Sequence, residues 1–141
     1  MLEIIKLSFD EYNQLINASP NYEQEYIKPY DFFEKYAWEN MGLIIDNKPV
    51  YFGALTLNKI KNRFQLWTRV NSNVKEQFSL YKVAKKIAYL WAKKYKEIYC
   101  TMPKDLITNL KWTKQMGFIP IEENDNKITL VLKRREKLWC L

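Results

Sequence analysis

The sequence predicts a mixed α/β fold in which helices cover both faces of one sheet. The expected order of elements is β-α-α-β-β-β-α-β-α-β-β, and no repeat or linker interrupts the 141 residues. Three consecutive strands imply antiparallel pairing, whereas the strand–helix–strand unit after them implies a pair of parallel strands. Hydrophobic residues make up 48% of the chain, which is enough for a packed core. We therefore expect a single domain over residues 1–141, with 134–141 as a tail.

The first elements are expected to be a strand and two short helices. Ser8 and Glu11 have the spacing of a capping box, which predicts a helix that begins at Phe9. Asp31 is placed to cap the second helix. The ranges expected here are a strand over 2–7, a helix over 9–16, a loop over 17–29 and a helix over 32–39.

The middle of the chain is expected to form three adjacent strands. Their ranges are 41–46, 50–57 and 64–70. Asn47, Lys48 and Pro49 form the expected turn between the first two strands, and Asp46 is expected to be a turn residue. Gly53 lies inside the second strand, which indicates a bulge or a close backbone approach.

The remaining elements are expected to be a long helix and a closing unit. Their ranges are a helix over 74–95, a strand over 97–102, a helix over 105–116 and strands over 118–121 and 127–133. Gly117 is expected to end the shorter helix as its C′ residue. The long helix has an apolar face made of Leu80, Val83, Ala84, Ile87, Trp91 and Tyr95. Lysines occupy its other faces, at Lys82, Lys85, Lys86, Lys93 and Lys96, and we expect a solvated face there in preference to nucleic-acid contact.

The composition favours an anionic partner and argues against several kinds of site. The net charge of +7 fits nucleic acid, an acidic protein surface or a phosphorylated cofactor, although an AT-rich genome would also encode many lysines. The chain has no histidine, and Cys100 and Cys140 form no CxxC pair, so we expect no metal. Cys100 is expected to be a buried, reduced thiol. No signal peptide or membrane-length apolar run is visible, which predicts a cytoplasmic or virion-associated protein without a membrane partner.

The element order, with the closing unit around Lys114, Gly117 and Phe118, resembles the GNAT superfamily of acyl-CoA N-acyltransferases. Residues 94–123 also look similar to the small GNAT-like proteins of T7-type bacteriophages, which are associated with virion assembly. The resemblance implies that the strands over 64–70 and 97–102 splay apart, so that the pantetheine of acetyl-CoA enters the gap. The gap is either open or filled by Phe78, Tyr81 or Trp112.

The resemblance also implies which residues would bind the cofactor. Strand residues Trp67, Thr68, Arg69 and Val70 would bind pantetheine. The start of the long helix would bind the pyrophosphate, through Lys75, Gln77, Phe78 and Ser79. Residues 70–80 contain no glycine, and Glu76 adds a negative charge there, so we expect this site to be poor.

The catalytic groups implied by the family are largely missing. The position of the family's tyrosine general acid falls at Thr113, whose hydroxyl is a much weaker acid than a phenol. The position of its asparagine falls at Leu106, and Asn109 is out of register. No general base is found, because Asp46 is the single acidic residue on the three central strands.

Three functional hypotheses follow. The first is a phage-encoded binding or assembly protein with weak or no acetyltransferase activity, which contacts a protein partner through exposed aromatic residues. The candidates are Tyr22, Tyr26, Tyr30, Trp38 and Trp139, although Trp38 is expected to pack in the core. The second is an acetyl-CoA-dependent N-acetyltransferase in which Thr113 or a water handles protons. The third is a basic nucleic-acid-binding module, which no known motif supports.

Overall fold

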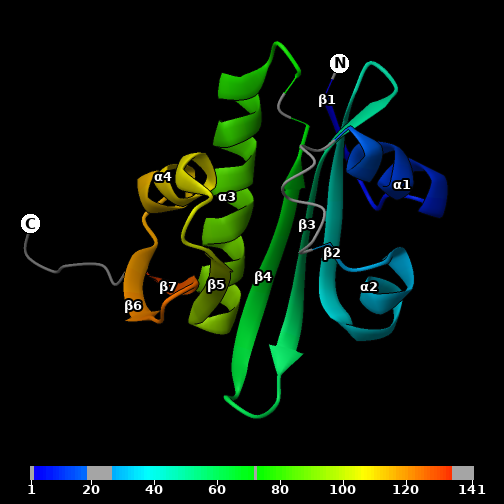
Figure 1. Cartoon of the computed structure of the whole chain (residues 1–141). Coiled ribbons are helices and arrows are strands. Elements are labelled where there is room, and N and C mark those ends of the chain that lie inside the picture. Colours follow the sequence, from blue (N-terminus) through cyan, green and yellow to red (C-terminus); the bar gives the residue numbers. More distant parts are fainter. Residues whose placement is uncertain (1, 19–26, 72, 135–141) are drawn as a thin grey trace, which may run out of the picture.

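The computed structural model describes residues 2–18, 27–71 and 73–134, which form one seven-stranded sheet with helices on both sides (Figure 1). The strand order is β1-β2-β3-β4-β5-β7-β6, and only β4 and β5 pair in parallel among the described strands. The mixed α/β prediction is confirmed. The strands are β1 (Leu2–Ile5), β2 (Ala37–Ile45), β3 (Lys48–Asn58), β4 (Arg63–Val70), β5 (Glu97–Pro103), β6 (Ile119–Glu123) and β7 (Lys127–Lys133). The helices are α1 (Phe9–Asn17), α2 (Tyr30–Tyr36), α3 (Gln77–Tyr95) and α4 (Ile107–Gln115).

The two N-terminal helices differ in how well the sequence predicted their ends. The capping box of α1 is present: Ser8 Oγ accepts from the Glu11 N–H at 3.2 Å, and Glu11 Oε1 accepts from the Ser8 N–H at 2.9 Å. The expected cap at Asp31 is wrong, because α2 begins at Tyr30 after Pro29. Residues 37–39 belong to β2 and not to the helix. Their pairing with β3 stabilises them more than an extra turn at the end of a short helix would.

The β2–β3 hairpin turns one residue earlier than expected. Asp46 and Asn47 have φ values of 50° and 67°, as a two-residue hairpin turn with a right-handed twist requires, and Lys48 already belongs to β3. Gly53 lies at neither of the register shifts between these strands. A Cβ at Gly53 would lie 2.9 Å from the Tyr51 hydroxyl, so the close approach is that of a side chain and not of the backbone.

Helices cover opposite faces of the sheet (Figure 1), and a separate hydrophobic core lies on each face. On one face α3 packs on β5 and β7, and its buried residues include the predicted Leu80, Ala84, Ile87 and Trp91. On the other face α1 and α2 cover β3 and its neighbours, with Tyr12, Phe33 and Phe52 packed ring to ring.

Trp38 contradicts the expectation of core packing. Its side chain is 61% exposed and meets the edge of Phe64 at a centroid distance of 5.5 Å. The reason is a register shift between Ala37 and Glu39, which places Trp38 at an irregularity of the strand. Tyr30 is half-buried, and its hydroxyl donates to the Leu7 carbonyl at 2.9 Å.

The C-terminal elements follow the prediction closely. The helix α3 begins at Gln77, three residues later than expected, and Gly117 ends the α4 region with a φ of 108°. Lys82, Lys86, Lys93 and Lys96 are exposed, whereas Lys85 is half-buried.

No helix in the described ranges is long and apolar enough to cross a membrane, and no cluster of potential metal ligands is found there. Tyr22, Tyr26, Trp139 and Cys140 lie outside the described residues.

Candidate functional site: a cavity between β4 and β5

A cavity of about 660 Å³ lies where β4 and β5 separate. The two strands pair at Gln65 and Tyr99 only, near their N-terminal ends. Each strand is paired along its whole length on the other side, β4 with β3 and β5 with β7. Beyond the single pair, the facing edges make no ladder bonds with each other, so their peptide groups border the cavity. The predicted splay is present.

Six of the predicted site residues line this cavity: Trp67, Thr68, Arg69, Val70, Gln77 and Thr113. Lys75, Phe78 and Ser79 do not belong to the described lining and are exposed, with Phe78 at 71%. The gap is therefore open. Trp112 forms part of the cavity wall, and the centroid of its ring lies 5.3 Å from that of Tyr81. The described lining includes neither Tyr81 nor Phe78.

Side-chain amides organise the glycine-free segment before α3. Gln77 Nε2 donates to the carbonyls of Asn71 and Val74, each at 3.1 Å. The Asn71 N–H donates to the Val50 carbonyl at 2.9 Å, which ties the segment to β3. Glu76, at the N-cap position, makes no side-chain cap, so the first N–H groups of α3 are not capped by that residue.

Thr113 lies at the cavity, but its hydroxyl is engaged elsewhere. Thr113 Oγ1 donates to the Asn109 carbonyl at 2.8 Å, four residues back in the same helix. Asn109 lines the cavity as well, and Leu106 occupies the N-cap position of α4.

The charged residues in the described lining are Lys28, Arg69 and Lys127, and no aspartate or glutamate is among them. Burial raises the pKa of the Cys100 thiol to about 12, although the nearby Arg69 acts in the opposite direction. Burial also raises the pKa of Tyr51. Cys100 therefore stays a thiol at neutral pH, in agreement with the predicted buried, reduced cysteine.

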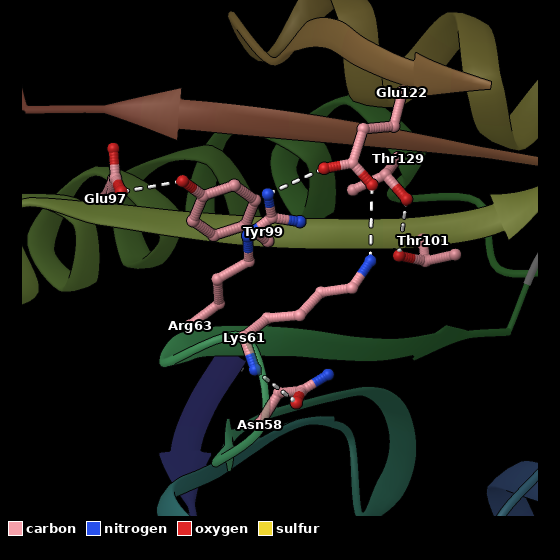
Figure 2. Close-up of polar contacts among 8 residues, drawn as sticks. All are labelled: Asn58, Lys61, Arg63, Glu97, Tyr99, Thr101, Glu122 and Thr129. Atoms are coloured by element: carbon pink, nitrogen blue, oxygen red, sulfur yellow. Dashed lines mark hydrogen bonds and ion pairs between the residues drawn. The ribbon is translucent and has the colours of Figure 1, made fainter.

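A polar group that we call the apex cluster (Lys61, Arg63, Glu97, Tyr99 and Glu122) lies where β4 and β5 still pair (Figure 2). Arg63 Nη2 lies 2.6 Å from Glu122 Oε1, and Lys61 Nζ lies 3.3 Å from Glu122 Oε2. The Arg63 guanidinium lies 4.4 Å from the centroid of the Tyr99 ring, whose hydroxyl donates to Glu97 at 2.6 Å. The cluster joins the β3–β4 hairpin to β6 across β5 and β7.

Several cavity residues were not singled out in the sequence. Lys28 precedes α2, Lys127 begins β7, and Thr101 lies on β5 with its hydroxyl 3.0 Å from that of Thr129. Their position depends on strand register and on packing between distant segments, which no local pattern reports.

Comparisons with known proteins identify the fold. No protein-family model matches the chain, and no curated protein matches it. Among solved structures, the ribosomal-protein-S18-alanine N-acetyltransferase from Escherichia coli is similar over 100% of this chain and 99% of that one, with a TM-score of 0.71 and 13% identity. The chain has the GNAT acetyltransferase fold.

Two further solved structures agree. The GNAT domain of PAT from S. lividans has a TM-score of 0.74 at 7% identity, covering 94% of this chain and 89% of that one. RimL, a ribosomal L7/L12 alpha-N-protein acetyltransferase solved in complex with coenzyme A, has a TM-score of 0.66 at 10% identity, covering 94% of both chains.

Proposed function

We propose that this chain binds an acyl-coenzyme A and transfers its acyl group to an amine. The observation that carries the proposal is the open cavity between β4 and β5, which is lined by the strand residues expected to bind pantetheine. Solved proteins of the same fold include an alanine N-acetyltransferase and an acetyltransferase in complex with coenzyme A.

The strand edges at the cavity fit the pantetheine of such a cofactor, whereas the start of α3 has no glycine and carries the negative charge of Glu76. Pantetheine carries two amides, and the unpaired strand edges at the cavity offer peptide N–H and C=O groups to them. On the β4 side these groups belong to Trp67–Val70. A pyrophosphate would be held by the N–H groups at the start of α3, next to the loop that Gln77 organises. When bound, the cofactor supplies a thioester whose carbonyl carbon is open to attack by an amine.

The lining restricts how protons are handled. The amine nitrogen forms a bond to the acyl carbon, the C–S bond breaks, and the proton lost by the amine balances the one gained by the thiol. The described lining holds no carboxylate to remove that proton, and Thr113 donates to its own helix. The amine therefore has to enter in its neutral form, with water as the proton carrier. The acyl group is expected to pass directly from the cofactor to the amine and not through Cys100, because a protonated thiol is a poor nucleophile.

Calorimetric titration with acetyl-CoA tests the proposal. We expect micromolar binding to the unmodified chain, and binding weakened at least about tenfold in Thr68→Phe, whose ring would fill the cavity. Ile60→Phe is the matched control, because Ile60 is 97% exposed in the β3–β4 connection. No binding at millimolar acetyl-CoA, or equal binding by both variants, would contradict the proposal.

A second candidate is the accessory role expected from the sequence, in which a phage-encoded, virion-associated chain keeps the fold but transfers acyl groups weakly or not at all. Two observations favour it: the hydroxyl of Thr113 is engaged within α4, and the exposed Trp38 offers an apolar contact to a protein partner. A folded chain that fails to bind acetyl-CoA would favour this role. Binding of nucleic acid by the α3 lysines stays a prediction.

A further inference from the structure

The charged side chains in the described part of the cavity lining all have the same sign. The chain contains 16 acidic residues, yet the charged side chains of the described lining are three cations, Lys28, Arg69 and Lys127. Because low-dielectric walls concentrate the field of such charges, the cavity favours anionic ligands and disfavours cationic ones.

The three cations belong to the face of the sheet that α3 does not cover. Trp67 packs with the α2 residues of the opposite core, and Arg69 follows it by two residues, so both side chains lie on that face. On β7, Ile128 packs in the core beneath α3, so its neighbour Lys127 lies on the opposite face. Lys28 comes from the segment before α2, and its carbonyl accepts from the Tyr12 hydroxyl.

The cations lie on both sides of the gap. Arg69 lies on β4, and the carbonyl of Lys28 accepts from Tyr12, which belongs to the same core as Trp67 of β4. Lys127 pairs with the last residue of β5 across the β5–β7 ladder, so it lies on the far wall. A ligand in the gap would therefore have positive charge on both sides.

Two of these cations are not neutralised by ion pairs within the described ranges. The ion pairs found there engage Lys6, Lys61, Arg63, Lys94 and Lys104. Lys28 Nζ lies 5.5 Å from the centroid of the Phe32 ring, a contact that leaves its charge available. The phosphates of an acyl-CoA are expected at the start of α3, on the other face, so they do not account for these cations.

We infer that the acyl acceptor carries a carboxylate beside its amine, as amino acids and short peptides do, and that Lys28, Arg69 and Lys127 bind that carboxylate. The inference rests on the proposed function and specifies its acceptor. The cavity of about 660 Å³ also has to hold the pantetheine arm, which leaves room for a small acceptor. Polyamines and lysine-rich peptides are disfavoured because they would bring positive charge to a positive site.

The test measures acetyl-CoA-dependent thiol release with a panel of L-amino acids, their carboxamides and spermidine. Rates are compared per neutral amine, because the carboxamides have a lower amine pKa. We expect at least one amino acid to exceed its carboxamide about tenfold in kcat/KM, the size of one charge-assisted hydrogen bond. Spermidine is expected to be a poor acceptor.

Variants separate this inference from the proposed function. Lys127→Met and Lys28→Met should each remove most of the preference for the amino acid while leaving the Kd for acetyl-CoA within about twofold, since both lysines lie outside the cofactor's expected phosphate site. Lys86→Met, an exposed lysine on α3, is the matched control and should change neither quantity. Equal rates for acids and carboxamides, spermidine as the best acceptor, or a cofactor-binding protein that acetylates no member of the panel would overturn the inference. Failure to bind acetyl-CoA would overturn the proposed function itself.

Discussion

At the scale of single residues, the shape of the cavity depends on Gly53. The side chain of Tyr51 lies against this glycine, and Tyr51 is also part of the cavity wall. A glycine inside a strand normally weakens it, so its presence here is explained by the ring that it accommodates. The sequence showed that Gly53 was unusual, but it could not show that a side chain two residues away was the cause.

Gly53→Ala should therefore displace the Tyr51 ring toward the cavity. We expect a loss of about 1–3 kcal/mol in the free energy of unfolding and weaker acetyl-CoA binding, because the new methyl group would lie 2.9 Å from the hydroxyl. Denaturant unfolding and calorimetry measure the two effects. In a Tyr51→Phe background, which removes the nearest atom, the loss should be smaller. An equal loss in both backgrounds would show that the ring is not the cause.

The charges of individual lining residues determine the expected pH dependence of acyl transfer. With no carboxylate in the described lining and Cys100 protonated, kcat/KM should rise tenfold per pH unit until the acceptor's own amine pKa, which is about 8 for a peptide N-terminus. Stopped-time assays with two acceptors of different amine pKa check this. The pH at which kcat/KM levels off should follow the amine pKa of the acceptor, and Cys100→Ala should leave the dependence of kcat/KM on pH unchanged. A break at one fixed pH for both acceptors would indicate a base on the protein.

At the scale of elements, the separation of β4 and β5 is governed by long-range contacts. The apex cluster joins the β3–β4 hairpin to β6 at the point where the two strands still pair. We expect it to fix the angle at which the strands diverge, since the rest of the facing edges lacks ladder bonds. Exposed ion pairs add little to stability. Loss of the apex cluster should therefore weaken acetyl-CoA binding more than it lowers the free energy of unfolding.

Arg63→Met tests this role. We expect weaker acetyl-CoA binding with a loss of less than about 1 kcal/mol in the free energy of unfolding, because the variant removes the guanidinium that contacts both Glu122 and Tyr99. Lys104→Met is the matched control, since the Lys104–Glu123 ion pair of 2.6 Å also reaches β6 but lies away from the β4–β5 pair. If both variants weaken binding equally, the apex cluster has no special role.

The elements also show what the sequence can and cannot predict. The capping box of α1, the apolar face of α3 and the Gly117 terminus depend on neighbouring residues, and all three were predicted. The exposure of Trp38 follows from a register shift, and the cavity positions of Lys28 and Lys127 follow from contacts between distant segments. Such features depend on the whole sheet, so local patterns missed them.

At the scale of the whole molecule, buried acids make stability sensitive to high pH. Burial raises the pKa values of Cys100 and Tyr12 to about 12, from ordinary values of 9.0 and 10.0, and raises that of Tyr51 as well. Between the ordinary and the folded pKa, the folded state holds a proton that the unfolded state has released. The free energy of unfolding therefore falls as pH rises above about 9.

Urea unfolding between pH 7 and pH 11 checks this prediction. Each such group should contribute about 1.4 kcal/mol per pH unit to the decline once its ordinary pKa is passed. Tyr12→Phe should make the decline shallower above pH 10, whereas Tyr36→Phe, which alters a side chain 50% exposed, should not. A stability that stays level up to pH 11 would contradict the burial of these groups.

If the gap between β4 and β5 is an acyl-coenzyme A site, addition of coenzyme A should change the backbone amide NMR shifts of the residues that border it. We expect the largest shifts in Leu66–Val70 and in Cys100–Met102, the strand edges that border the cavity. Shifts confined to the exposed lysine face of α3, or none at millimolar coenzyme A, would contradict it.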